Sequence, residues 1–501
     1  MDTKRYHKIR LLVYSSIFCL YLIHFIACSL SALPGFSSFY VDSDMHANLR
    51  WAESIGEQGP LNPQPFHPYN EWMQSIAPFS TWVSWWGSIA VYQQSPLYAY
   101  FLAIILKCSG SVFAVHFSQL IIGFLLCASI GTLAEEVSNN RTVGLIALII
   151  SGLYGPFYAY AWPLLRDLLS WLIISTFALL VIRWWRMWGE NEYPSTWLSI
   201  RLGVVLALGL LVREIFYVYV IIVVSASGFQ ALRSRRYQPL IYMLVAFLVF
   251  ISPLIIRNII AGAPPVSTSN RFAETFIEFN APSAPGTELM IPFREMTYIL
   301  ERSRGAALAV VRETLALYEN DYWPLLQKMG EKALSLLDPF EAPDNVNIYY
   351  MQLISPVVRY ALPHWLVIVP GIYGCILSLV KHDRRWIWFW VLFFCLFANV
   401  ILFGPIARYR QVLCIFWIPW AAYYIYFMVN QSSRRRIAGF LLILIGCVLC
   451  TYLSPERTPK QLYRASEFNV SAEIYDAWGE PGKAQGQIKL YEKLTNPHGG
   501  N

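Results

Sequence analysis

The chain has 501 residues, of which 56% are hydrophobic and 14% are charged, and its mean hydropathy is +0.44. A water-soluble domain carries about 25% charged residues, so this composition excludes an ordinary soluble protein and predicts an all-α polytopic membrane protein. The net charge of +7 collects in basic clusters beside apolar runs, which the positive-inside rule assigns to cytoplasmic loops rather than to a nucleic-acid surface.

The predicted membrane spans begin with residues 11–33, whose basic flank places the N-terminus in the cytoplasm. Residues 34–95 then form a first external loop. The apolar stretch 97–106 would be about 15 Å long as a helix, so we expect it to enter only half of the ~30 Å hydrocarbon core. Further spans are expected near 113–134, 142–162, 164–183, 200–212, 214–230, 238–258, 361–380, 386–404, 411–429 and 437–454.

This reading predicts about eleven transmembrane helices, plus or minus two. The N-terminal transmembrane module covers 1–258, an external (periplasmic) region covers 259–360, and the C-terminal transmembrane helices cover 361–455. An external tail, 456–501, contains SAEIYDAWGEPGKAQGQIKLYEKL, which has the spacing of one tetratricopeptide-like helical pair. A single repeat cannot bury its own faces, so the pair either docks on the external loops or is degenerate.

Two carboxylates, Asp42 and Asp44, follow the first span in YVDSDMHANLRWAESI. They fit a solvated loop, a metal-binding DxD motif that holds a nucleotide diphosphate, or a catalytic base. An external site has no ready nucleotide supply, which disfavours the metal motif. A partly desolvated carboxylate at the membrane edge can accept a proton from a hydroxyl. Ala47, Trp51 and Ile55 share one helical face, so Asp44 would begin a helix whose dipole favours its charged form.

Several arginines fall near the predicted external ends of spans, namely Arg213, Arg257, Arg408 and Arg410. A lone arginine there is explained by snorkelling to lipid headgroups. Guanidinium also binds phosphate in a bidentate manner and keeps its proton. A carboxylate and several arginines on one face therefore predict a site for a lipid-phosphate leaving group and a hydroxyl nucleophile.

The chain carries, in a characteristic order, VDSDMHANLRWAESI, QSPLYAYFLA, YGPFYAYAWPLLRDLLSWLIIS, LLVREI, SPLIIRNIIAGAPPVSTSNRFAETFIEFNAPSAPG, DPFEAPDN and ARYRQVLCIFWIPWAA. In this order, over most of residues 10–430, the chain resembles GT-C glycosyltransferases. The branch it resembles comprises bacterial relatives of protein O-mannosyltransferases (the dolichyl-phosphate-mannose-protein mannosyltransferase family) and aminoarabinose transferases.

The resemblance implies a GT-C fold in a bacterial inner membrane. The succession of spans and basic loops is expected to leave the C-terminus on the external, periplasmic side. The resemblance also implies transfer of a sugar from a polyprenyl-phosphate donor to an acceptor hydroxyl on a lipid, glycan or protein, by an inverting single displacement. The expected base is Asp44, which precedes Trp51-Ala52 as in the family, and Asp42 is the fallback. No cofactor is expected, and a divalent metal stays an open alternative.

The other expected site residues fall into two groups. The donor phosphate is assigned to Arg213, Arg257, Arg408 and Arg410, and substrate binding is assigned to His46, Tyr98, Asn258 and Glu341.

The sequence departs from the family at three places. Met45 and His46 stand where a Tyr is common, Ala161-Trp162 stands where relatives have Glu-Gly, and Gln94 replaces a Lys found in some relatives. Neither a second acid nor a lysine–phosphate contact is therefore carried over.

Arg166 and Asp167 lie close to the missing Glu-Gly pair and are expected to pair with each other. Two other functions stay open, a lipid-linked-sugar transporter or flippase and a non-catalytic glycolipid-binding assembly protein. A transporter built from repeats would show two similar halves, and the sequence shows no clear internal repeat.

Overall fold

The computed structural model describes residues 3–189, 193–381, 383–454 and 457–496. Residues 1–2, 456 and 497–501, which belong to the predicted N-terminal module and tail, lie outside the described residues. Throughout the described part, the regular elements are helices, and the β-type contact is one isolated bridge between Tyr154 and Leu362. The predicted all-α class is confirmed.

Seven helices in the described part of the chain are long and apolar enough to cross a membrane. They are α1 (Thr3–Ser29), α7 (Val112–Ser138), α10 (Asp167–Gly189), α12 (Phe216–Ser234), α13 (Gln238–Ala261), α21 (Ile387–Phe403) and α24 (Ser433–Leu453). Shorter apolar helices are α6 (Leu97–Ser109), α8 (Arg141–Gly152), α11 (Thr196–Leu210), α20 (His364–Val380) and α23 (Cys414–Val429). The chain is thus a multi-pass membrane protein. The count of about eleven crossings stays a prediction, because length alone does not decide whether the shorter helices cross.

One predicted span is divided in the structure. The segment expected to form a single helix over 142–162 forms α8, which ends at Gly152, and the short α9 (Gly155–Ala159). Pro156 lies in the first turn of α9, where its missing N–H is tolerated, but it could not continue the helix before it. The break leaves 160–166 as irregular chain leading into α10.

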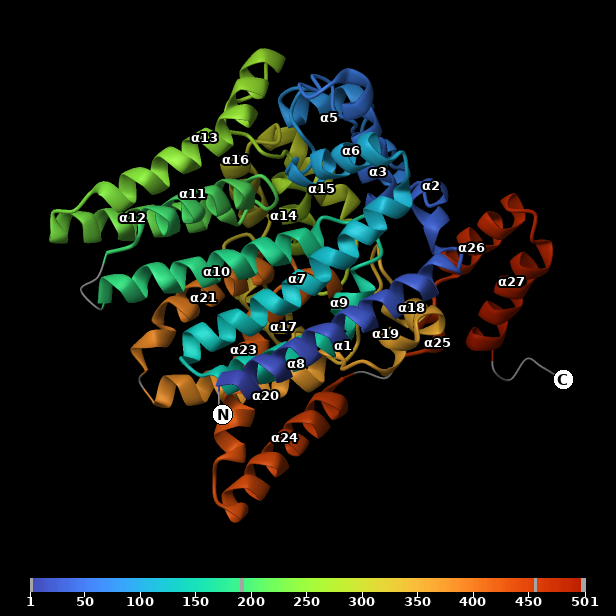
Figure 1. Ribbon diagram of the computed structural model, residues 1–501. Helices are drawn as coiled ribbons and strands as arrows, with labels where there is room; N and C mark the ends of the chain where they lie inside the picture. The colour runs from blue at the N-terminus through green and yellow to red at the C-terminus, as the bar shows by residue number, and fades with distance from the viewer. Residues whose placement is uncertain (1–2, 190–192, 382, 455–456, 497–501) are drawn as a thin grey trace.

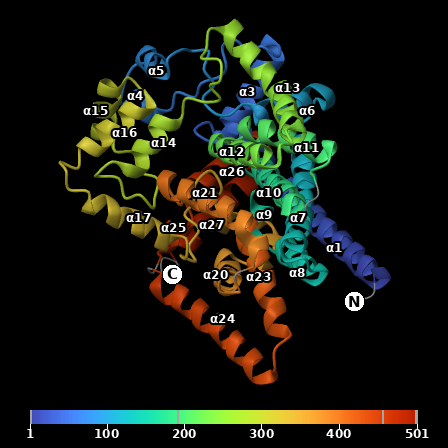
Figure 2. The same cartoon turned by 90° about the vertical axis from the view of Figure 1, so that its left-hand side faces the viewer.

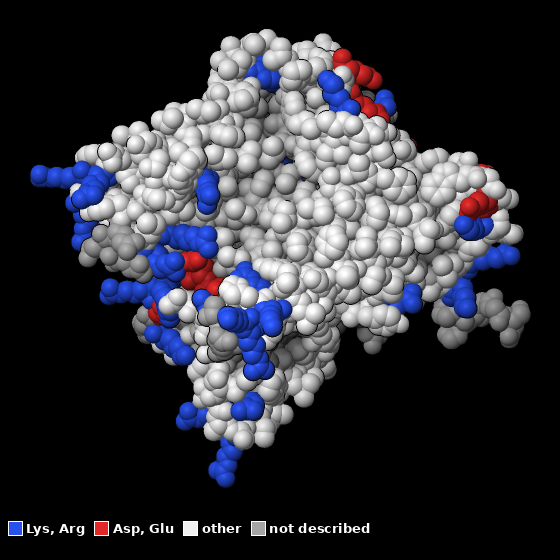
Figure 3. All heavy atoms as spheres, in the orientation of Figure 1, with Lys and Arg blue, Asp and Glu red and all other residues white. Residues whose placement is uncertain are grey.

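Basic residues gather at one end of the helix bundle, called here the basic end. Arg10 pairs with Glu135 at 3.0 Å, and Arg183 pairs with Glu136 at 2.9 Å. Arg385, in the turn η2 (Arg384–Trp386), donates to a carbonyl in the last turn of α7 at 3.2 Å. Figure 3 shows the blue side chains at the lower left, beside a broad uncharged surface. This is the end that the positive-inside rule assigns to the cytoplasm.

The outer helices present apolar side chains to their surroundings. On α24, which lies at the edge of the bundle (Figures 1 and 2), Ile437 and Leu444 are about 60% exposed. On α10, by contrast, Trp171, Phe177 and Trp184 are completely buried. An exposed apolar patch of this extent is typical of a membrane-facing surface, and α10 forms part of the protein core.

The irregular segments and short helices lie mostly at the other end, called here the loop end (Figures 1 and 2). The first loop region contains η1 (Leu33–Gly35), α2 (Phe36–Phe39), α3 (Asp44–Gln58), α4 (Glu71–Gln74) and α5 (Phe79–Trp86). The second contains α14 (Phe272–Asn280), α15 (Phe293–Ser303), α16 (Ala307–Ala316), α17 (Trp323–Ser335), α18 (Ile348–Ile354) and α19 (Pro356–Tyr360). The short α22 (Ala407–Gln411) links α21 to α23.

The helix predicted to begin at Asp44 is present as α3. Its N-cap is Ser43, whose hydroxyl accepts a hydrogen bond from the backbone N–H of His46 at 3.2 Å. Ala47, Trp51 and Ile55 are all buried, as their shared face requires. Asp44 therefore lies in the first turn, where the helix dipole favours a carboxylate.

The tail docks on both loop regions, against Gly35 in the first and Tyr350 in the second. It consists of α25 (Pro459–Leu462), α26 (Ala465–Ala477) and α27 (Pro481–Thr495). Ile474 packs so closely on Gly35 that a Cβ there would lie 2.9 Å from it. The rings of Phe468 and Tyr350 meet edge to face at 5.1 Å between centroids. The helical pair α26 and α27 thus buries one of its faces against the rest of the chain, whereas a single repeat could not bury its own faces.

Candidate functional site

A cavity opens at the loop end where several helices begin or finish. Its volume is about 840 Å³, its open mouth included. The apolar part of its lining comes from Ile174, Ile215, Phe272, Leu396, Val400, Phe403 and Val412, and the charged part comes from Arg166, Arg213, Glu214, Arg271 and Arg408. The cavity therefore has the two surfaces, apolar and cationic, that an amphiphile with an anionic head requires.

The four arginines reach the cavity because each one stands next to a helix terminus. Arg166 directly precedes α10, and Arg213 lies in the turn between α11 and α12. Arg271 is the N-cap residue of α14, and Arg408 lies in α22. Helix ends meet at the loop end of the bundle, so positions far apart in the chain converge there.

Two of these arginines pair crosswise with acidic neighbours. Arg166 pairs with Glu214 at 3.5 Å, and Arg213 pairs with Asp167, whose side chain is almost completely buried. The expectation that Arg166 and Asp167 pair with each other is wrong. The dipeptides 166–167 and 213–214 lie side by side, so each acid meets the arginine of the other dipeptide.

Asp44 lies directly behind the other two arginines. Its Oδ2 accepts a hydrogen bond from Arg408 at 2.7 Å, and its Oδ1 accepts one from Arg271 at 3.4 Å. Asn345 donates its amide to Oδ2 at 3.1 Å and accepts the backbone N–H of Asp44 at 2.7 Å. Arg408 also forms an ion pair with Asp344 at 2.7 Å. Asp44, Arg408, Asp344 and Asn345 thus form one connected cluster, of which Arg408 lines the cavity and the other three lie behind that lining.

The arginines set the charge state of Asp44. Burial alone would raise the pKa of its carboxyl, but Arg408 and Arg271 outweigh burial and hold the pKa well below its ordinary value. Asp44 is therefore ionised and, while both guanidinium groups hold it, only weakly basic. Neither Asp44 nor Asp42 lines the cavity, but Asp44 bonds two arginines that do, whereas Asp42, the fallback residue, is exposed.

Arg408 and Arg410, predicted to act together on a phosphate, face different cavities. Residues two apart on a helix point in nearly opposite directions. Arg410 lines a second cavity of about 1720 Å³, open mouth included, between α20, α24 and the segment around Asp338. The segment 404–410 therefore forms the wall between the two cavities.

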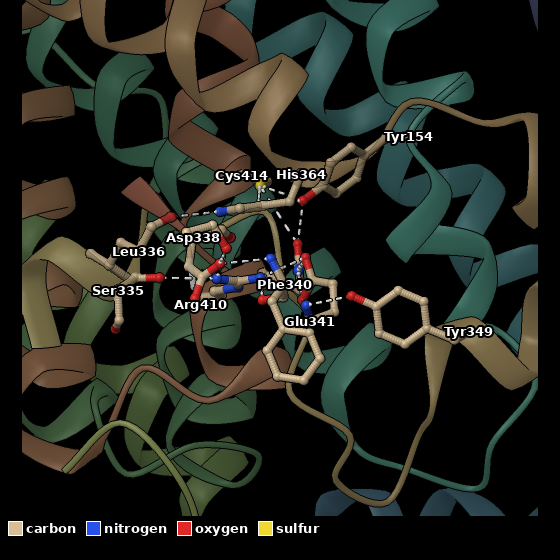
Figure 4. A network of polar contacts seen from close by, with 12 residues as sticks. Tyr154, Ser335, Leu336, Asp338, Phe340, Glu341, Tyr349, His364, Arg410 and Cys414 are labelled. Atoms are coloured by element: carbon tan, nitrogen blue, oxygen red, sulfur yellow. Dashed lines mark hydrogen bonds and ion pairs between the residues drawn. The ribbon is translucent and has the colours of Figure 1, made fainter. Parts of the chain in front are cut away.

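Arg410 is held by the loop that follows α17 (Figure 4). It pairs with Glu341 at 2.9 Å and donates to the carbonyls of Ser335 at 3.0 Å and Asp338 at 2.9 Å. Gln411 adds two hydrogen bonds to Glu341, both at 2.9 Å. The structure thus uses Arg410 and Glu341 to fasten this loop to α22.

Arg257 is occupied by the first loop region. Its guanidinium donates to the carbonyls of Leu61 at 2.9 Å, Ala90 at 2.5 Å and Asn62 at 2.6 Å, and it lies 4.0 Å from the ring centroid of Tyr92. Arg257 does not line the arginine cavity.

The remaining predicted substrate-binding residues also make internal contacts. Asn258 donates to three carbonyls of the loop after α13, at 2.9–3.1 Å. Tyr98 is buried and donates to Gln119 at 2.8 Å. A ring nitrogen of His46 lies 3.0 Å from the carbonyl of Ser37. None of the three lines the arginine cavity.

The sequence reasoning did not select Arg271, Asp344 and Asn345. Arg271 and Asn345 lie inside two stretches that carry the family resemblance, SNRFAETF and DPFEAPDN. An arginine at the start of a short amphipathic helix and an Asp-Asn pair in a loop are signals that the sequence contains. Nothing local shows that both segments return to the first turn of α3.

Of the comparisons with known proteins, the one with solved structures gives matches. No family model matches the sequence, and no curated protein matches it. The chain is similar to the Archaeoglobus fulgidus oligosaccharyltransferase in the apo form, with a TM-score of 0.44 and 12% identity over 93% of this chain and 59% of that one. It is also similar to the archaeal oligosaccharyltransferase AglB from Archaeoglobus fulgidus in complex with an inhibitory peptide and a dolichol-phosphate (TM-score 0.44, 13% identity, 96% and 59%). The chain thus spans 59% of the length of both structures.

Proposed function

We propose that this chain is a membrane glycosyltransferase of the GT-C type. It transfers a sugar from a polyprenyl-phosphate donor to an acceptor hydroxyl on the periplasmic face of a bacterial inner membrane. The observation that carries the proposal is the cavity in which four arginines meet an apolar lining, with Asp44 bonded to two of those arginines. The family resemblance of the sequence segments points in the same direction.

The donor is expected to lie along the cavity with its tail on the apolar side. Leu396, Val400 and Phe403 on α21 offer a surface for the isoprene units nearest the phosphate. Arginine forks match the geometry of phosphate oxygens and cannot lose their charge. A volume of about 840 Å³ is in the range of sites that enclose a small ligand, which suits a sugar phosphate and the first part of its tail.

Within the predicted phosphate-binding set, the proposal keeps Arg213 and Arg408 and adds Arg166 and Arg271. These four line the cavity. Arg257 is left out because loop carbonyls occupy its guanidinium.

In the proposed reaction, Asp44 accepts the proton of the acceptor hydroxyl. The acceptor oxygen bonds to the anomeric carbon while the bond from that carbon to the phosphate oxygen breaks. The electron pair leaves with the polyprenyl phosphate, and the configuration at the anomeric carbon inverts. The arginines stabilise the negative charge that develops on the leaving phosphate, which fixed charges in a partly dry site do effectively.

The proposal is tested with purified protein in lipid nanodiscs, a labelled polyprenyl-phosphate sugar and candidate acceptors. Wild type should release polyprenyl phosphate and label an acceptor. Asp44→Asn should lower turnover by about 10²–10⁴-fold, the usual contribution of a positioned base. The control Asp42→Asn alters an exposed carboxylate two residues away and should keep most of the turnover. Near-normal turnover of Asp44→Asn would show that Asp44 is not the base.

The same preparation separates the rival functions. A flippase would move the labelled lipid between the leaflets of a vesicle without breaking its sugar–phosphate bond. A binding or assembly protein would retain the lipid and do neither. Either result in place of sugar transfer contradicts the proposal.

A further inference from the structure

Every hydrogen-bonding oxygen of Asp44 is engaged by a neighbouring side chain. Oδ1 faces Arg271, and Oδ2 faces both Arg408 and Asn345. The two oxygens of a carboxylate offer about four lone-pair sites, so a site on Oδ1 stays open, but the two guanidinium groups make the carboxylate a weak base. Since the carboxyl group must accept the acceptor's proton in the proposed reaction, the loss of a guanidinium partner would make it a stronger base.

The arginine cluster carries no spare charge for a donor phosphate. Four arginines, Arg166, Arg213, Arg271 and Arg408, are paired with four carboxylates, Glu214, Asp167, Asp44 and Asp344. The formal charges of these eight groups therefore sum to zero. An entering phosphate therefore meets guanidinium groups that a carboxylate already holds, and the two anions compete for the five N–H donors of each arginine.

Two of these carboxylates hold their arginines by long contacts, Glu214 to Arg166 at 3.5 Å and Asp44 to Arg271 at 3.4 Å. Asp44 is the one of the two that also acts as the base in the proposed reaction. Asp167, the partner of Arg213, is 1% exposed and lies deepest. The Arg271–Asp44 contact is long at 3.4 Å, and Arg271 is the most exposed of the four arginines, at 24%. Arg408 has Asp344 as a second partner at 2.7 Å and keeps one carboxylate if it turns from Asp44 to a phosphate.

Asn345 would hold Asp44 in place during this exchange. It contacts the residue twice, through the backbone N–H at 2.7 Å and through the carboxylate at 3.1 Å. Asn345 itself is uncharged, so an entering phosphate does not compete for these two contacts as it does for those of the arginines. The carboxylate would keep its position at the start of α3 while its oxygens become available.

We infer that the donor phosphate takes Arg271 and Arg408 from Asp44 and thereby turns Asp44 into an effective base. Asp44 is the anion that these two arginines hold, and the donor phosphate replaces it there. The donor must then bind before the acceptor can be deprotonated. This inference rests on the proposed function, and it adds an order of events and a second role for Asp44.

Competition of this kind is reciprocal, because the phosphate and the Asp44 carboxylate bind the same guanidinium groups. Removing the carboxylate should therefore strengthen phosphate binding. The loss of any carboxylate beside a phosphate also relieves charge repulsion, so the binding measurement is paired with an infrared measurement that follows the guanidinium contacts of Asp44 directly.

The experiment measures the binding of polyprenyl monophosphate to the full chain in nanodiscs at one fixed pH. Asp44→Asn should bind about tenfold more tightly than wild type, which corresponds to about 1.4 kcal/mol. Asp44→Glu keeps the anion and should not gain affinity. Glu53→Gln removes the carboxylate of an exposed pair in the same helix, with Arg50 at 2.7 Å, and should leave affinity unchanged. Equal or weaker binding by Asp44→Asn, or an equal gain in Glu53→Gln, overturns the inference.

A second measurement does not depend on the Asn variant folding. Infrared difference spectra of protein with ¹³C-labelled aspartate, with and without polyprenyl monophosphate, should show a carboxylate band shifting as its guanidinium partners leave. In Asp44→Glu this band should disappear from the labelled region. A spectrum with no aspartate change on binding contradicts the inference.

Failure of the inference and failure of the proposed function give different results. If Arg271→Gln and Arg408→Gln bind polyprenyl monophosphate as well as wild type, the phosphate site itself is misplaced and the proposed function loses its basis. If both variants bind more weakly but Asp44→Asn shows no gain, the phosphate site stands and only the exchange is refuted.

Discussion

Arg408 and Arg410 stand two positions apart in α22, and replacing each with glutamine should damage different properties of the protein. Both side chains are buried, and both pair with carboxylates. Arg408 faces the cavity assigned to the donor, and Arg410 faces the loop after α17. Arg410→Gln should therefore lower stability only, and Arg408→Gln should lower turnover as well.

Both substitutions should cost stability, because each removes the partner of a buried carboxylate. Arg410→Gln leaves Glu341 with only Gln411 and removes the donor of three carbonyls, those of Ser335, Asp338 and Phe340. Arg408→Gln leaves Asp44 with Arg271 and Asn345, and it leaves Asp344 without its ion pair. Breaking a buried ion pair costs about 3–5 kcal/mol, which is a large share of the about 5–15 kcal/mol that stabilises a folded protein. Turnover per folded molecule, rather than stability, therefore separates the two variants.

The assay combines thermal unfolding in detergent, followed by tryptophan fluorescence, with turnover per folded molecule. Both variants should unfold at a lower midpoint than wild type, and Arg410→Gln should keep near-normal turnover in its folded fraction. Arg408→Gln should lose about 10²–10³-fold in turnover, the effect of removing one transition-state donor. If Arg410→Gln unfolds like wild type but has lost turnover, Arg410 acts on the substrate and the assignment of the two cavities is wrong.

Three further predictions test other parts of the structure. Burial raises the pKa of Glu278 in α14 to about 7, above its ordinary 4.5. The stability linked to Glu278 should thus be present at low pH and fall as pH rises through about 7. The temperature of the unfolding midpoint should therefore be lower at about pH 8 than at about pH 5, and this difference should be smaller in Glu278→Gln. A Cβ at Gly374 would lie 1.9 Å from the carbonyl oxygen of Trp420. Gly374→Ala should therefore cost about 1–3 kcal/mol and lower the unfolding midpoint, whereas Gly228→Ala, which meets nothing within 4 Å, should not. Cys108, exposed at the end of α6, should react with an impermeant thiol reagent added to intact cells; labelling only after permeabilisation would show that α6 crosses the membrane.

The helices were the part of the fold that the sequence could predict, because their signal is local. An apolar run long enough to cross a bilayer shows itself in the residues it contains, and a helix lies within each predicted span. The error at 142–162 has a local cause as well. Gly155 and Pro156 interrupt an apolar run whose hydropathy alone looks continuous.

The candidate site likewise has one part with a local sequence signal and another part without one. The position of Asp44 at the start of a helix could be predicted from its neighbours, since Ala47, Trp51 and Ile55 share one face of that helix. Its partners could not. Asp44 meets Arg271, Asn345 and Arg408 across 227, 301 and 364 residues of chain. Contacts across such separations leave no periodic signal, and they depend on how the loops between the spans return.

The arginines show why a count of guanidinium groups on one face is a poor guide to a phosphate site. Irregular loops leave backbone carbonyls without partners, and every buried one needs a donor. Arginine has five N–H groups, so it satisfies loop carbonyls as readily as it binds a substrate. Arg257 donates to three of them, and that set cannot be exchanged for a phosphate without opening the loop. The guanidinium of Arg271 donates its hydrogen bond to a carboxylate, and one anion can replace another at the same guanidinium. The chemical nature of the resident partner, rather than the number of arginines, is therefore the property that separates an arginine able to receive the donor from one that holds the fold.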